Sequence, residues 1–242
     1  MKAQSYSFLK KIFITFLFLS IAWSKEVPFK VGESLKYIAE FNFIPVGQAE
    51  LYVTGIEQIN GNDAYHVSFS ANTKGLANQL FPIQDRIDIW MDTKEFFTHR
   101  LTKDINEGNY KNSVDVIFDY DKFVAKTETK EVAIDFKARD SFSMFYYLRT
   151  IPIKENEVMS FSSYEGRKIV HYNLQMTGKE TVNSPLGTFS CKVIRPFSDG
   201  KNLFKNAGDM QIWISDDNER LPVKIQIKMK FGSMMLLLKK VS

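Results

Sequence analysis

The residues in this sequence best suited to acid–base chemistry are two adjacent carboxylates, Asp216 and Asp217. A carboxylate pair can cleave a glycosidic bond when the two groups flank that bond from opposite sides. This pair stands in "SDDNER", a stretch of residues that accept turn geometry and hydrogen-bond their own backbone. Neighbours in a turn rarely aim both carboxylates across one bond. The sequence therefore predicts a hairpin turn, with a metal or surface ligand and catalysis as alternatives.

Other metal-ligating and nucleophilic residues are few and far apart. The three histidines, His66, His99 and His171, form neither a His-x-His nor a His-Glu-x-x-His pattern. His66 and His171 alternate with apolar neighbours, which predicts solvent-facing positions on strands. Cys191 is the only cysteine, so no internal disulfide can form, and its place in an alternating apolar run predicts a buried, inert thiol. We therefore expect no metal, no cofactor and no catalytic residue, and an enzyme is the less favoured class.

Two tryptophans and one arginine are candidates for ligand binding. Trp90 and Trp213 each follow an isoleucine in a predicted strand. We predict that both anchor the core, with the isoleucine facing out; a partly exposed tryptophan that stacks on a ligand is the alternative. Arg149 lies at the end of a predicted helix, where a cation stabilises the last carbonyls. Binding of an anionic ligand is the alternative role for Arg149.

Alternation of apolar and polar residues with period two dominates the chain and predicts antiparallel strands. Runs such as 49–53, 65–69 and 189–193 show this period, and turn signals such as "NGND" at 60–63 separate them. The chain is also rich in Phe and Tyr, with 21 and 10 copies, which suits sheet surfaces. These features predict a mainly β fold.

Two segments break the period. Residues 74–82 predict a short helical turn that Pro82 ends. Residues 140–150 predict a longer helix, capped by Asp140 or Ser141, with Phe142, Phe145 and Tyr146 at i, i+3 and i+4. This helix lies midway along the chain, so we expect it to connect two β halves, at about 25–137 and 151–242.

A weak repeat supports this division. At an offset of 123 residues, 51–60 matches 174–183 with shared Leu, Thr, Gly, Glu and Asn, and the pair Ile89-Trp90 matches Ile212-Trp213. Chance matches between hairpins are common, so common ancestry stays open. We nevertheless predict equivalent structural roles for the two Ile-Trp segments.

The last predicted strand is apolar at five successive positions, from Met234 to Leu238. A half-exposed strand would alternate, so both faces of this strand need cover, from the helix, a partner or an apolar ligand. A plain core between helix and sheet is the first interpretation, and an apolar groove is the second. The residues that could bind a ligand are then Trp90, Phe142, Phe145, Tyr146, Arg149, Trp213, Met234 and Met235.

The N-terminus resembles an export signal. Lys10 and Lys11 precede the apolar run 12–23, and small residues at 22 and 24 predict cleavage before Lys25. The run is short for a membrane span, which needs about 20 residues. The whole chain has 32 Lys and Arg against 28 Asp and Glu, and removal of residues 1–24, with three Lys, leaves 29 against 28. We therefore expect a nearly neutral mature protein, soluble in the periplasm of a Gram-negative bacterium, without a nucleic-acid partner.

Several segments, in order, resemble a family of exported bacterial proteins, domain of unknown function 3108. They are "FKVGESLKY", "VGQAEL", "DSFSMFYYLR", "TGKETV" with "LGTFSCKVIRP", and "IWISDDNERLPVKI". Asn156 stands where this pattern has Gly, which affects only a turn. The resemblance implies a cell-envelope location and a strongly curved antiparallel sheet, but no activity. The implied architecture is similar, at the level of fold, to that of envelope lipid carriers, but a fold does not determine a function.

The expected architecture is a curved antiparallel sheet or open half-barrel, with the central helix on its concave face. The function that we favour is a cell-envelope binding or carrier protein for a lipid or a lipid-linked glycan. The alternative is a non-enzymatic assembly or structural partner that binds protein or polysaccharide. An empty apolar cavity would favour the carrier, whereas a filled core with an exposed aromatic patch would favour the partner.

Overall fold

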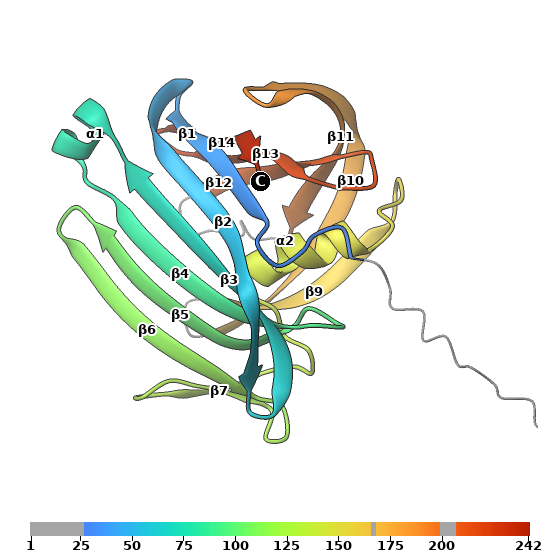
Figure 1. Ribbon diagram of the computed structural model, residues 1–242. Coiled ribbons are helices and arrows are strands. Elements are labelled where there is room, and N and C mark those ends of the chain that lie inside the picture. The colour runs from blue at the N-terminus through green and yellow to red at the C-terminus, as the bar shows by residue number, and fades with distance from the viewer. Residues whose placement is uncertain (1–26, 166–167, 199–206) are drawn as a thin grey trace, which may run out of the picture.

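The computed structural model describes residues 27–165, 168–198 and 207–242 (Figure 1). The predicted signal peptide, residues 1–24, lies outside the described residues. The predicted fold class is confirmed: the chain forms one antiparallel sheet of 14 strands, which curves round a central helix without closing into a barrel.

The first part of the chain is a meander in which each strand pairs with the next. Its turn between β2 and β3 uses Asn60 and Gly61 with φ of 50° and 78°, values that a tight two-residue hairpin turn requires. The elements are β1 (Ser34–Phe41), β2 (Ile44–Ile59), β3 (Asn62–Thr73), α1 (Gly75–Leu80), β4 (Gln84–Asp92), β5 (Thr98–Glu107), β6 (Tyr110–Asp119), β7 (Val124–Lys126) and β8 (Glu131–Ala133).

The helix α2 (Ser141–Thr150) follows at the predicted position and leads to a second meander. The two meanders join because β1 pairs with the last strand, so that the strand order is β8-β7-β6-β5-β4-β3-β2-β1-β14-β13-β12-β11-β10-β9. The strands of the second meander are β9 (Val158–Glu165), β10 (Lys168–Ser184), β11 (Gly187–Phe197), β12 (Ala207–Ser215), β13 (Pro222–Met229) and β14 (Gly232–Val241).

The two meanders share irregularities at the offset of 123 residues. The pairing of β2 with β3 shifts register between Val53 and Gly55, and that of β10 with β11 shifts between Met176 and Gly178. The register also shifts directly after Trp90 in β4 and directly after Trp213 in β12. Strands β1–β6 therefore correspond in order to β9–β14.

The core lies between α2 and the concave face of the sheet (Figure 1). Tyr146 of α2 shares one buried cluster with Leu238 of β14, and Phe145 belongs to a second cluster against which Leu236 packs. Helix α2 and β14 thus contribute side chains to the same core clusters, in agreement with the predicted core between helix and sheet.

Candidate ligand-binding site

The N-terminus of α2 is fixed by a capping box. The Asp140 carboxylate accepts hydrogen bonds from the amides of Phe142 at 2.7 Å and Ser143 at 3.2 Å, and the Ser143 hydroxyl accepts from the Asp140 amide at 3.0 Å. Thr98, at the start of β5, donates its hydroxyl to the same carboxylate at 2.6 Å. The predicted cap is confirmed, and it ties the helix start to the sheet.

The C-terminus of α2 is fixed by Arg149. This side chain is 1 % exposed and forms a two-pronged ion pair with Glu33, at 2.6 and 2.9 Å, while also donating to the carbonyl of Pro28 at 2.6 Å. Arg220 donates to the carbonyls of Arg149 at 3.0 Å and Ile151 at 3.1 Å. Arg149 is therefore fully engaged within the protein and is not among the residues that line the cavity described below. Its role is structural, but it binds Glu33 and carbonyls outside the helix, whereas Arg220 binds the last helix carbonyls.

Equivalent loops of the two meanders hold the two ends of the helix. At its N-terminal side, Arg139 donates to the carbonyl of Glu95 in the β4–β5 loop at 2.8 Å. At its C-terminal side, Arg149 donates to the carbonyl of Glu219 in the β12–β13 loop at 3.2 and 3.3 Å. The helix is thus anchored across the concave face at both ends, which makes it a rigid wall for any space beneath it.

Between α2 and the sheet lies a cavity of about 280 Å³, partly open to solvent. Its walls are almost entirely apolar and come from α2 and from strands on both sides of the β1–β14 junction. The lining residues are Tyr37, Leu51, Phe69, Ser141, Phe142, Met144, Phe145, Glu165, Val170, Tyr172, Leu174, Pro196, Met210, Ile212, Ile225, Ile227 and Leu236. The space suits an apolar group.

One corner of the cavity is polar. Glu165, at the end of β9, accepts hydrogen bonds from the hydroxyls of Ser141 and of Ser163, the latter at 2.9 Å. Tyr172 also lines the wall, and burial, followed by the nearby Glu165 charge, raises the pKa of its hydroxyl well above the usual range. This corner therefore presents one carboxylate and neutral hydroxyl groups, which suit a hydrogen-bond donor on the ligand.

Of the predicted ligand-binding residues, the structure brings Phe142 and Phe145 to the cavity wall. Tyr146 lies on another side of the helix, 1 % exposed, and its ring contacts Phe29 edge-on at 4.8 Å between centroids. A helix turns 100° per residue, so neighbours in one stripe can face different clusters. Met234 and Met235 are not among the lining residues; their strand contributes Leu236 instead.

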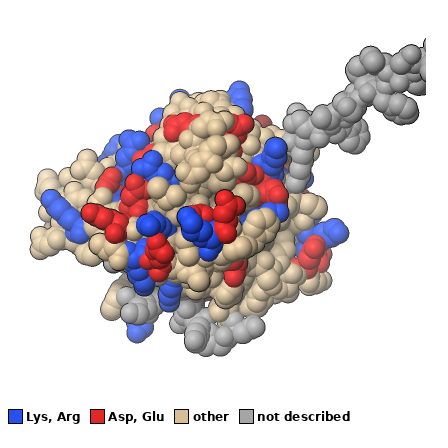
Figure 2. All heavy atoms as spheres, turned by 90° about the horizontal axis from the view of Figure 1, so that it is seen from below, with Lys and Arg blue, Asp and Glu red and all other residues tan. Residues whose placement is uncertain are grey.

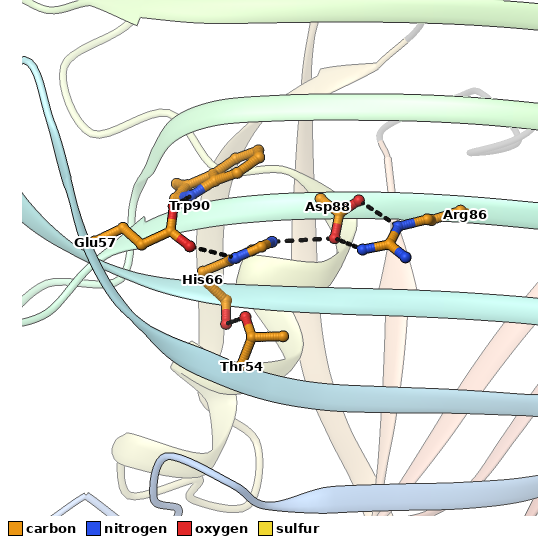
Figure 3. A network of polar contacts seen from close by, with 6 residues as sticks. All are labelled: Thr54, Glu57, His66, Arg86, Asp88 and Trp90. Atoms are coloured by element: carbon orange, nitrogen blue, oxygen red, sulfur yellow. Dashed lines mark hydrogen bonds and ion pairs between the residues drawn. The ribbon is translucent and has the colours of Figure 1, made fainter.

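Trp90 lies outside the cavity, on the face of β4 opposite to the buried Ile89, which packs in a core cluster. The prediction that the isoleucine faces out is therefore wrong. Trp90 is nonetheless 8 % exposed, because its indole Nε1 donates to Glu57 at 2.7 Å, His66 stacks on its ring at 4.5 Å and Arg100 lies 4.8 Å from the ring centre (Figure 3). A covering of polar side chains can bury an aromatic ring as well as a core does.

The network round Trp90 includes a histidine between two carboxylates (Figure 3). His66 places Nδ1 2.8 Å from Glu57 and Nε2 3.0 Å from Asp88, and Arg86 donates to Asp88 at 2.7 Å. Burial would raise the pKa of Asp88, but the hydrogen bonds from Arg86 and His66 together lower it. Both imidazole nitrogens already face carboxylates, so this group crosslinks β2, β3 and β4 rather than offering a nitrogen to a substrate. His66 is less exposed than the sequence suggested, at 14 % of its side chain.

Trp213 repeats this arrangement in the second meander. Its Nε1 donates to Glu180 at 2.8 Å, and the Lys224 ammonium lies 3.8 Å from the ring centre. Burial lowers the pKa of that lysine. Both tryptophans bond a glutamate 33 residues earlier in the chain, so the predicted equivalence of the two Ile-Trp segments is confirmed. As in β4, the isoleucine faces inward: Ile212 lines the cavity.

The acidic pair forms the turn between β12 and β13, as predicted. Asp217 accepts from the amides of Glu219 at 3.0 Å and Arg220 at 2.9 Å, and Asp216 pairs with Lys179 at 2.5 Å and Lys192 at 3.0 Å. The two carboxylates thus have separate structural partners. Among the described residues, no group of three or more His, Cys, Asp or Glu side chains could hold a metal ion.

On the face of the molecule shown in Figure 2, basic and acidic side chains are interspersed. The described part of the chain contains no helix with the length and apolar character needed to cross a membrane.

The sequence left most of the cavity wall unassigned. Tyr172, Leu174, Ile212, Ile225 and Ile227 all come from the second meander. None of them is among the predicted ligand-binding residues, and Ile212 was predicted to face out. The signal that was available lay in the repeat. Because Trp213 corresponds to Trp90, the same face had to be inward at Ile212 and at Ile89.

A family model described as protein of unknown function (DUF3108) matches residues 36–239, nearly the whole described fold. The chain belongs to this family. The predicted resemblance to DUF3108 is thereby confirmed. No curated protein matches the sequence.

Solved structures similar to this DUF3108 protein share little sequence with it. A beta-barrel-like protein of domain of unknown function DUF1849 from Brucella abortus aligns with a TM-score of 0.58 and 11 % identity, over 88 % of this chain and 97 % of that chain. This likeness supports the fold alone. Weaker likenesses, with TM-scores of 0.39 and 0.38 and 12 % identity, are to a lipoprotein candidate from Parabacteroides distasonis and an exported-protein candidate with a YmcC-like fold from Bacteroides fragilis; each covers 89 % of this chain and 98 % of the other.

Proposed function

We propose that this protein is a cell-envelope binding or carrier protein whose cavity takes the apolar part of an amphiphile, a lipid or a lipid-linked glycan. The observation that carries the proposal is the apolar cavity between α2 and the concave face of the sheet. Apolar cavities with a few convergent polar groups are the usual form of small-molecule sites.

The solvent access of the cavity supports a ligand site over a packing defect. Because the cavity is partly open to solvent, its apolar walls are left in contact with water. Removal of apolar surface from water is favourable, at about 25 cal/mol per Å². A bound apolar group would cover these walls.

The cavity volume of about 280 Å³ limits the ligand. A cavity of about 150 Å³ holds benzene, and drug-sized sites begin near 300 Å³. The cavity therefore suits one alkyl chain or a compact apolar group rather than two full acyl chains. Glu165 in the polar corner favours a hydroxyl or amine on the ligand over a carboxylate, because two carboxylates would repel each other.

Location in the envelope rests on the basic and apolar N-terminal segment of the sequence.

Binding of the neutral apolar probe N-phenylnaphthylamine tests the proposal. We expect saturable binding to the wild type and loss of binding in Val170→Phe, which adds a ring to the cavity wall. Val158→Phe is the matched control, since Val158 is 49 % exposed at the start of β9 and lies outside the cavity. A folded Val170→Phe that binds the probe like the wild type would contradict the proposal and favour the assembly-partner alternative.

A further inference from the structure

Exposed apolar side chains gather at one end of the sheet. At this end β1, β3, β5 and β13 finish and β2, β4, β6 and β14 begin, because neighbouring strands are antiparallel. Among the described residues, the five most exposed large apolar side chains all lie here, and the group ranges from 52 to 85 % exposed. We call this group the apolar rim: Phe43, Ile44, Leu76, Leu80, Phe81 and Phe231.

Backbone contacts make the apolar rim one continuous surface. Two hydrogen bonds of 2.9 Å between Asn42 and Ser233 join the β1–β2 turn to the start of β14. The Lys74 amide donates to the carbonyl of Val46 at 2.9 Å, which joins α1 to β2. The Pro82 carbonyl, just after α1, accepts from the amide in the β5–β6 turn at 2.7 Å. Figure 1 shows α1 and the ends of β1 and β2 on this side of the molecule.

The exposed charge at this end is mainly positive. The connections that the structure describes here, residues 42–43, 74–83, 108–109 and 230–231, contain Lys74 and Lys230 and no Asp or Glu. At the adjoining strand ends, Lys111 and Lys228 are exposed, whereas the carboxylates Glu40, Asp85 and Glu107 are half-buried. In the described part of the chain, none of these four lysines lies within ion-pair distance of a carboxylate.

The cavity reaches this same end. Its wall includes Glu165, the last residue of β9, Val170, near the start of β10, and Ile227, near the end of β13. At the other end, α2 and the aromatic cluster of Phe29 and Tyr146 fill the space. The cavity wall therefore extends to the end of the sheet that carries the apolar rim.

We infer that the apolar rim docks on an anionic phospholipid bilayer, so that the cavity exchanges its ligand with the membrane. The docking rests on the apolar rim alone, and the exchange rests on the proposed function. Exposed apolar patches mark protein or membrane contacts. Separate apolar side chains on several turns, flanked by exposed lysines that form no ion pair among the described residues, fit a fluid anionic interface, in which apolar groups enter the acyl boundary and lysines face the phosphates.

Cosedimentation with vesicles tests the docking. We expect the wild type to bind vesicles of phosphatidylcholine with phosphatidylglycerol more strongly than vesicles of phosphatidylcholine alone. Phe43→Ser and Phe231→Ser should each weaken binding at least about tenfold, which is the factor in affinity that corresponds to the free energy of burying one such side chain. Lys74→Gln and Lys230→Gln should each weaken binding about fivefold on the anionic vesicles only. Phe136→Ser is the matched control, since Phe136 is 63 % exposed between β8 and α2, outside the apolar rim.

Failure of the wild type to bind either vesicle would overturn the inference and assign the apolar rim to a protein partner. An equal loss in Phe136→Ser would also overturn it. The proposed function is tested separately, because Phe43→Ser should still bind N-phenylnaphthylamine, whereas Val170→Phe should lose the probe and still bind vesicles. If Val170→Phe retains the probe while the vesicle results hold, the carrier proposal fails and the docking stands.

Discussion

At the scale of single residues, Cys191 illustrates how burial decides reactivity. The side chain is inaccessible to solvent, and burial, more than the neighbouring carboxylates, raises the pKa of its thiol to about 11. We predict that iodoacetamide near neutral pH leaves the native protein unmodified and alkylates it in guanidinium, as mass spectrometry would show. Rapid alkylation of the native protein would contradict the buried position.

The ion pair between Arg149 and Glu33 is buried on both sides. Removal of one partner of a buried pair leaves an uncompensated charge and typically costs about 3–5 kcal/mol. We expect Glu33→Gln to lower the free energy of unfolding by an amount of this order in urea titrations. Asp115→Asn is the control, because Asp115 pairs with Arg100 at the surface, where such pairs contribute about 0–1 kcal/mol. Equal effects of the two changes would show that the Arg149 pair is solvated.

His99 gives the protein a defined pH dependence. Burial lowers the pKa of His99, and the hydrogen bond to Asp92 only partly opposes this effect. Between the folded pKa and the unfolded value of about 6.5, the unfolded chain binds more protons, so stability falls as the pH drops through this range. We expect His99→Gln to reduce the slope of unfolding free energy against pH below about 6.5. An unchanged slope would indicate that other groups account for the pH dependence.

At the scale of elements, α2 serves both the core and the cavity. Phe145 is 9 % exposed and borders the cavity, so its loss enlarges a space that already exists. We predict that Phe145→Ala stays folded, loses about 3 kcal/mol of stability, near the lower limit for a buried Phe, and binds N-phenylnaphthylamine weakly. Unchanged stability together with unchanged probe binding would mean that α2 does not form the cavity wall.

The elements themselves could be predicted because their signals are local. The alternation of apolar and polar residues predicts the strands. Asp140 marks the start of the helix and Pro152 its end, and Asn60-Gly61 predicts a turn. The face of each tryptophan could not be read this way. Each ring nitrogen donates to a glutamate on another strand, Glu57 for Trp90 and Glu180 for Trp213, and such pairing depends on register.

The cavity could be predicted only in part for a related reason. Phe142 and Phe145 carry a helical spacing that marks them as inward, and they line the space. Tyr146 has the same spacing and packs elsewhere, against Phe29. Whether inward side chains meet or leave space between them depends on the curvature of the sheet, which no local pattern encodes.

At the scale of the whole molecule, two meanders of corresponding strands share one sheet, joined at β1 and β14 and spanned by α2. The short strands β7 and β8 extend the first meander beyond β6, and the concave face of the open sheet holds a helix and a cavity together. One end is filled by aromatic residues and the helix, and the other carries the apolar rim. This arrangement gives the molecule an apolar cavity with a polar corner at Glu165.

Native mass spectrometry of the protein, expressed with residues 1–24 and extracted gently without detergent, shows directly whether the cavity carries a ligand. We predict a chain that begins at Lys25 and carries one noncovalently bound apolar molecule, released by organic solvent and absent from Val170→Phe. Wild-type protein that is free of any such molecule and takes up none when amphiphiles are added would contradict this prediction, as would a bound molecule that persists unchanged in Val170→Phe.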